Sequence, residues 1–209
     1  MAGADLRGAA KESARWDWEL MPLEGVGPLC FGMCITEVTA ALPGMIELRR
    51  FQASPYSETV GVEFGIGPAE PAVYAYFIDG QLFCVAVDAA RGPQVTLWGR
   101  ELTACPPADF EDFLLHAHRC EVVQVSYGPR ANPGVNELGL VVRVQEVAGG
   151  LVTRPVMVGR AWAARCTDDW EGCIPECEWV GRMWPLPGES TVWPPPGHTT
   201  QWGDWLPPF

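Results

Sequence analysis

Lysine is nearly absent from this chain, which has Lys11 alone against thirteen arginines. Basic residues number 14 and acidic residues 26, so the formal net charge is −12. An acidic surface repels nucleic acids and anionic membranes and attracts basic proteins. We therefore predict no nucleic-acid partner and favour a basic protein partner. The simpler alternative, that the acidity only keeps the protein soluble, stays open.

The chain also lacks a long apolar run. No stretch approaches the roughly 18 apolar residues that a helix needs to cross a bilayer. Residues 1–20 contain no apolar core of the kind found in signal peptides. We therefore expect a cytoplasmic protein that does not bind membranes. Its eight cysteines are then expected to be mostly reduced thiols.

Catalytic motifs are missing as well. The segment GVGPLCFG has neither the lysine of a P-loop nor the order of a dinucleotide-binding loop, and Ser126 and Ser190 lack a G-x-S-x-G context. His116 and His118 are two residues apart on a predicted helix, so they face different directions, and His198 lies in the C-terminal tail. We predict no catalytic residue, no cofactor and no enzymatic activity. A hydrolase that uses a Cys/His pair remains an alternative.

The cysteines leave a second alternative open. Cys30 and Cys34 form one pair with three residues between them, Cys173 and Cys177 form another, and Cys166 lies nearby. Structural zinc sites usually have two residues between paired cysteines, although two to four are tolerated. Free cysteines are also among the residues most often buried. Core thiols, with one or two cysteines in loops, are therefore favoured over a metal site, and we predict no metal ligand.

The clearest structural signal is a β-hairpin. Two runs rich in β-branched and aromatic residues, 73–78 and 82–87, flank Asp79 and Gly80. An Asp-Gly pair suits a two-residue turn in which both residues have positive φ. Residues 95–98 then read as a third strand of the same sheet.

A short helix is predicted at the segment ITEVTAAL. Thr36 is suited to cap its N-terminus, and Val38, Ala41 and Leu42 lie on one face of it. The pair Pro43-Gly44 then ends the helix.

A second helix is predicted at residues 108–118. It has an apolar stripe made of Phe110, Phe113, Leu114 and Ala117. Alternating apolar residues predict further strands at 45–52, 59–66, 121–126, 137–147 and 151–159.

These elements predict an α+β fold with antiparallel sheet, two short packed helices and two linked halves. We divide the chain into an N-terminal arm and lead-in (1–28), a first helix-plus-sheet half (29–104), a second such half (105–160), and an acidic Cys/Trp loop with an extended Pro/Trp-rich tail (161–209). Whether the halves share one core stays open. The tail is expected to dock on its own sheet, or alternatively to bind a groove of another protein.

The loop that precedes the tail combines acidic residues with tryptophans. Aromatic side chains anchor protein interfaces, and an acidic rim steers the association of a basic partner. The alternative is an ordinary acidic loop whose tryptophans cover the core. The predicted partner-binding residues are Asp168, Asp169, Trp170, Glu171, Glu176, Glu178 and Trp179.

The stretch GVGPLCFGMCITEVTAAL resembles the Gly-Met opening of the SmpA/OmlA lipoprotein and β-lactamase-inhibitor-protein superfamily. Gly32, Met33, Val38 and Leu42 match that opening, whereas Cys34 stands where the family usually has threonine. This opening and the hairpin AYFIDGQLFCVAVD are also similar to those of actinobacterial proteins, some of which accompany polymorphic toxins as immunity proteins. The resemblance implies a short helix packed on an antiparallel sheet, and a binding scaffold.

The sequence therefore favours a non-enzymatic protein-binding module. Its most concrete form is an immunity or antitoxin-type inhibitor that occludes a basic partner such as a toxin. Two alternatives remain: a structural subunit of a larger assembly, and a metal protein or hydrolase that uses the cysteines. The oligomeric state is left open.

Overall fold

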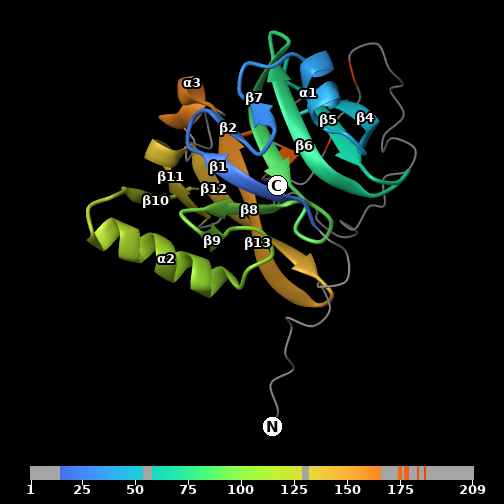
Figure 1. The fold of residues 1–209 in the computed structure, drawn as a ribbon. Coiled ribbons are helices and arrows are strands. Elements are labelled where there is room, and N and C mark those ends of the chain that lie inside the picture. Colours follow the sequence, from blue (N-terminus) through green and yellow to red (C-terminus); the bar gives the residue numbers. More distant parts are fainter. Residues whose placement is uncertain are drawn as a thin grey trace, which may run out of the picture.

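The computed structural model describes residues 15–53, 58–128, 132–165, 174–175, 177–178, 183 and 186 (Figure 1). The predicted fold class is confirmed, because the chain is mostly antiparallel sheet with a few short helices. Within the described residues, no helix combines the length and apolar character needed to span a membrane.

The strands are β1 (Asp17–Met21), β2 (Gly25–Val26), β3 (Leu29–Cys30), β4 (Ile46–Gln52), β5 (Val60–Gly65), β6 (Pro71–Ile78), β7 (Gln81–Val87), β8 (Gln94–Leu97), β9 (Arg100–Glu101), β10 (Val125–Tyr127), β11 (Pro133–Val135), β12 (Leu140–Val147) and β13 (Gly150–Val158). The helices are α1 (Ile35–Ala41), α2 (Pro107–Arg119), α3 (Arg160–Ala163) and the 3-10 turn η3 (Asn136–Leu138).

One large sheet joins the two predicted halves. Its order is β10-β11-β12-β13-β7-β6-β5-β4, so β7 of residues 29–104 pairs with β13 of residues 105–160. At this junction Met157 lies opposite Val85, and both side chains are fully buried in the same apolar cluster. The two halves therefore share one sheet and one core.

The predicted central hairpin is confirmed. Strands β6 and β7 pair in antiparallel register, with Ile78 opposite Gln81 at the turn. Asp79 and Gly80 both have positive φ, 51° and 74°. This is the backbone that a two-residue hairpin turn requires, and it explains why an Asp-Gly pair stands here.

The predicted third strand exists but belongs to another sheet. Strand β8 pairs in parallel with β1, in a small sheet ordered β3-β2-β1-β8-β9. The chain is diverted after β7 by Asp88, whose carboxylate accepts hydrogen bonds from the backbone N–H groups of Ala90 and Arg91. A Cβ on Gly92 would lie 2.5 Å from the carbonyl oxygen of Asp88, so this tight turn needs glycine. Trp98 lies outside the strand.

Helix α1 is confirmed, but its predicted N-cap is wrong. The cap is Cys34, two residues before Thr36, and the helix begins at Ile35. The backbone N–H of Cys34 donates to Glu37 Oε2 at 2.8 Å, which completes a capping box. Val38 is buried against the sheet as expected.

Helix α2 is confirmed over its predicted length, and Phe110, Leu114 and Ala117 of its stripe are buried. The later strands follow the prediction less closely. Of residues 121–126 only the end forms β10, and residues 137–138 belong to η3 before β12 begins. Strand β13 lies within the predicted range except for Gly150, its first residue.

The main core lies between the two sheets. Trp18 and Leu20 of β1 and Val95 of β8 pack with residues of the large sheet such as Val73 and Val85. In Figure 1 the small sheet lies in front of the large one, with α2 beside it. The opposite face of the large sheet carries a second, separate cluster of buried side chains.

Candidate functional site

The second face of the large sheet is covered by residues from far along the chain. Its cluster includes Phe51, Tyr76 and Val156 of the sheet, with Ile174 and Cys177 packed on them. The backbone N–H of Cys177 also donates to the carbonyl oxygen of Ala53 at 3.0 Å. Residues 174–175 and 177–178, called here the C-terminal segment, thus dock on the chain's own sheet.

Two arginines stand directly opposite each other on this face. Arg143 of β12 and Arg154 of β13 are cross-strand partners, so their side chains leave the sheet on the same side. Each side chain is only 15% exposed. Like charges in this position repel and destabilise a sheet unless a counter-charge lies between them.

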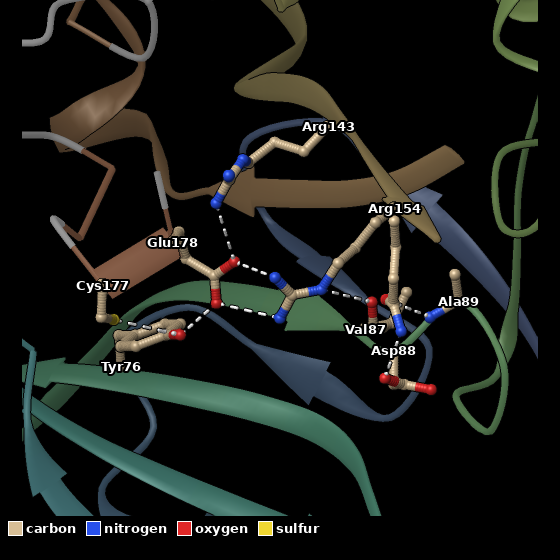
Figure 2. A network of polar contacts seen from close by, with 9 residues as sticks. Tyr76, Val87, Asp88, Ala89, Arg143, Arg154, Cys177 and Glu178 are labelled. Carbon is tan, nitrogen blue, oxygen red and sulfur yellow. Dashed lines mark hydrogen bonds and ion pairs between the residues drawn. The ribbon is translucent and has the colours of Figure 1, made fainter. Parts of the chain in front are cut away.

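Glu178 supplies that counter-charge. Its side chain is 2% exposed, and Figure 2 shows both arginines directed at its carboxylate. Arg154 donates from Nη1 to Oε2 at 2.5 Å and from Nη2 to Oε1 at 3.1 Å. Arg143 Nη1 lies 3.8 Å from Oε2, and the hydroxyl of Tyr76 donates to Oε1. The paired arrangement with Arg154 is the bidentate geometry in which guanidinium binds carboxylate most strongly.

Aromatic rings and apolar surroundings enclose this ion cluster. The guanidinium of Arg154 lies 4.7 Å from the ring centroid of Tyr74, a cation–π distance. Burial raises the pKa of Tyr76 well above its ordinary value, so its hydroxyl keeps the proton that it donates to Glu178. The thiol of Cys177 donates in turn to the hydroxyl oxygen of Tyr76 at 3.5 Å.

A further set of contacts ties the cluster to the turn after β7. Arg154 Nε donates to the carbonyl oxygen of Val87 at 3.2 Å, and Gln145 Nε2 donates to Asp88 Oδ2 at 2.8 Å. Gln145 also accepts a hydrogen bond from the N–H of Ala89. The arginine that binds Glu178 is therefore fixed in orientation by the backbone (Figure 2).

The position of Glu178 corrects part of the predicted partner surface. Glu178 lies in the interior, paired with two arginines, and contributes no exposed charge. The other residues predicted for that surface, Asp168, Asp169, Trp170, Glu171, Glu176 and Trp179, lie outside the described residues. No local pattern around Glu178 indicated this burial, because it depends on the register of the β12–β13 hairpin, which places Arg143 opposite Arg154.

The cysteines considered as metal ligands are spread over different environments. Cys30 and Cys34 are exposed beside α1, whereas Cys177 is buried under the large sheet; Cys166 and Cys173 lie outside the described residues. In the part of the chain that the structure describes, no three His, Cys, Asp or Glu side chains gather as a metal site.

The histidines at the end of α2 have separate contacts. His116 Nε2 lies 3.9 Å from Cys120 Sγ, one helical turn away, and the contact is exposed. The ring of His118 shares a hydrogen bond of 3.0 Å with the carbonyl oxygen of Val123. His118 thus ties the end of the helix to the loop that follows it. His198 lies outside the described residues.

The outer side of the small sheet is acidic. Asp17 and Glu19 alternate with buried residues along β1, and Glu19, Thr96 and Glu101 form one cross-strand row. The turn between β8 and β9 adds Trp98, which is 52% exposed. We call these five residues the acidic sheet face. The alternation in the segment DWELM was the sequence signal for it, since period two places every second residue on the same side.

No protein-family model, curated protein or solved structure matches this chain. The resemblance to the SmpA/OmlA and β-lactamase-inhibitor-protein superfamily, and to immunity proteins, therefore stays a prediction from the Gly32-Met33 motif. In the structure this motif forms the turn before α1, where Gly32 has φ 94° and Leu82 donates its backbone N–H to the carbonyl oxygen of Met33 at 2.8 Å.

The cysteines offer a direct test of the packing on the second face. Burial, followed by the charge of Glu178, raises the pKa of Cys177, and the reactive species of cysteine is the thiolate. We expect Cys177 and the buried Cys84 to resist a thiol reagent such as DTNB in the native protein, while Cys30 and Cys34 react promptly. Mass spectrometry of the labelled peptides measures this. Prompt native labelling of Cys177 would contradict the docked position of the C-terminal segment.

Proposed function

We propose that this chain is a non-enzymatic protein-binding module that acts in the cytoplasm. In its most concrete form it is an immunity or antitoxin-type inhibitor that binds a basic protein, such as a toxin, and occludes it. The observation that carries this proposal is the acidic sheet face, on which Asp17, Glu19 and Glu101 lie with Thr96, next to the exposed Trp98 in the adjoining turn.

The distribution of charge supports this assignment. Several arginines are used within the chain: Arg154 on Glu178, Arg49 on Glu63, and Arg50 on its neighbour Glu47. The carboxylates of the acidic sheet face, in contrast, belong to exposed residues. These three arginines are thus paired with carboxylates of the chain itself, and acidic residues remain in excess by a net charge of −12.

The acidic sheet face also has an aromatic anchor. The ring of Trp98 meets Phe113 of α2 edge-on at a centroid distance of 6.2 Å, and the guanidinium of Arg100 lies 5.7 Å from the ring of Phe113. A half-exposed tryptophan that packs against a neighbouring ring, as Trp98 does against Phe113, suits the role of an interface hot spot. The carboxylates around it would steer a basic surface into contact, and the inhibitor would act by covering that surface.

An affinity pull-down from a lysate of the source organism, followed by mass spectrometry, tests the function. The proposal expects one stoichiometric basic protein that is toxic when expressed alone and harmless when co-expressed with this chain. Recovery of only further copies of this chain, or of a partner whose activity is unaffected, would refute the inhibitor function.

Charge reversal tests the surface once that partner is known. The variant D17K/E19K/E101K is expected to lower the association rate constant at low salt by about tenfold or more, with a smaller change in the dissociation rate. Stopped-flow or surface plasmon resonance measures both rates.

The matched control is E58K/E137K/E146K, which changes the net charge equally at residues outside the acidic sheet face. We expect it to slow association much less. Equal losses in the two variants would show that net charge alone matters, and would remove the acidic sheet face from the interface.

A further inference from the structure

The large sheet contains the parts of an anion site independently of Glu178. Arg143 and Arg154 are fixed opposite each other by the register of the β12–β13 hairpin, which runs unbroken from Leu140 opposite Met157 to the turn. Their side chains are largely buried, so water screens their repulsion poorly. With the C-terminal segment docked, a carboxylate between the two arginines therefore offsets their repulsion.

The donors on this face match one carboxylate group. Arg154 contributes two parallel N–H groups, Tyr76 contributes its hydroxyl, and Arg143 approaches from the other side. Together they address both carboxylate oxygens. A planar fork with a third neutral donor is suited to a carboxylate, because the guanidinium geometry matches the spacing of its two oxygens.

The surroundings of the site are rigid and part of the sheet. Arg154 is held by the carbonyl oxygen of Val87 through Nε and by the ring of Tyr74 through its flat face. Tyr76 is packed edge-on against Phe51, with centroids 6.0 Å apart. These contacts come from strands β4, β6, β7 and β13, and none of them involves Glu178.

We propose that Arg143, Arg154 and Tyr76 form a carboxylate-binding site on the large sheet, and that Glu178 is its tethered ligand. The C-terminal segment is then held on the large sheet by the binding of its Glu178 carboxylate to these three side chains. A carboxylate from another molecule, either a small free acid or a glutamate side chain of a peptide, binds the same donors when Glu178 is replaced.

Carboxylate rescue of the full-length variant E178A is the test. We expect propionate at saturating concentration to raise the melting temperature of E178A by about 5 °C or more, since a ligand that binds the native state alone stabilises it. The same concentration of sodium chloride is expected to give a clearly smaller shift, and the wild-type protein should respond to propionate no more than to chloride. Isothermal titration calorimetry on E178A gives the stoichiometry, expected to be one.

Two variants serve as matched controls. E63A removes another buried glutamate, whose partner Arg49 is a single arginine with a 40% exposed side chain, and we expect no saturable response to propionate there. The triple variant R143M/R154M/E178A removes the donors, and it should lose the response completely. A response of the triple variant equal to that of E178A would overturn the proposal.

The variant E178A could fail to fold in the absence of a ligand, and refolding then replaces melting as the measurement. Denatured E178A diluted into propionate should regain its native near-UV circular dichroism, and dilution into chloride should leave it unfolded. Failure in both salts, with R143M/R154M/E178A folding normally, would overturn the proposal.

A peptide of residues 174–183 distinguishes the two sources of carboxylate. Stabilisation of E178A by this peptide, but not by the same peptide carrying the substitution Glu178→Gln, assigns the site to peptide-borne glutamate. Stabilisation by propionate alone assigns it to small free acids. No stabilisation by either ligand overturns the proposed site.

Discussion

Replacing Glu178 with alanine is expected to lower the free energy of unfolding by about 3–5 kcal/mol, because removing one partner of a buried ion pair leaves the other charge buried and unpaired. In E178A, Arg154 would lose its bidentate partner while still lying opposite the like charge of Arg143. The hydroxyl of Tyr76 would lose its acceptor as well. Urea denaturation with linear extrapolation measures the loss.

Two further variants show how large the loss of stability in E178A is by comparison. E47A breaks the exposed pair between Glu47 and Arg50 and is expected to cost about 0–1 kcal/mol. R143M/R154M/E178L replaces the whole charged set with apolar side chains and should be far closer to the wild type than E178A, because well-packed apolar groups can replace a buried ion cluster at little cost. A loss in E178A no larger than that in E47A would show that the C-terminal segment does not depend on this ion cluster.

Replacing Met157 with alanine is expected to cost about 2–5 kcal/mol, since it opens a cavity in the core. Met157 is fully buried and lies where β13 pairs with both β7 and β12, opposite Val85 and Leu140. Because the two halves share this core, we expect M157A to keep a single cooperative unfolding transition at a lower denaturant midpoint.

Two spectroscopic probes check that expectation. Tryptophan fluorescence and far-UV circular dichroism should give coincident transitions in M157A. The control M157L conserves volume and should cost less than about 1.5 kcal/mol. Two separated transitions, with one half unfolding before the other, would contradict the shared core and support two independent halves.

The proposed partner surface and the proposed carboxylate-binding site lie on different faces of the molecule. The acidic sheet face lies on the outer side of the small sheet, while the carboxylate-binding site lies on the far side of the large sheet, under the C-terminal segment. We therefore expect the charge reversal D17K/E19K/E101K to leave the stability effect of E178A unchanged, as is usual for distant substitutions. Binding to a partner and docking of the C-terminal segment can then be tested independently.

The elements that depend only on neighbouring residues were predictable from the amino-acid sequence. The turn at Asp79-Gly80 needs two residues that tolerate positive φ, and the apolar stripe of α2 needs only the helical period, so both were predictable. The alternation in residues 17–21 is local too, but these residues were assigned to the N-terminal lead-in, and β1 was not predicted. These signals depend on neighbours a few residues away.

The contacts between distant segments follow from the packing of the whole chain. The turn at Asp88 and Gly92 sends β8 to pair with β1, and the shared sheet brings β7 beside β13. Glu178 belongs to an acidic stretch whose composition resembles a solvated loop, yet it is buried because two arginines of a hairpin more than twenty residues earlier require a counter-charge. That requirement depends on strand register and burial, which no local pattern around Glu178 encodes.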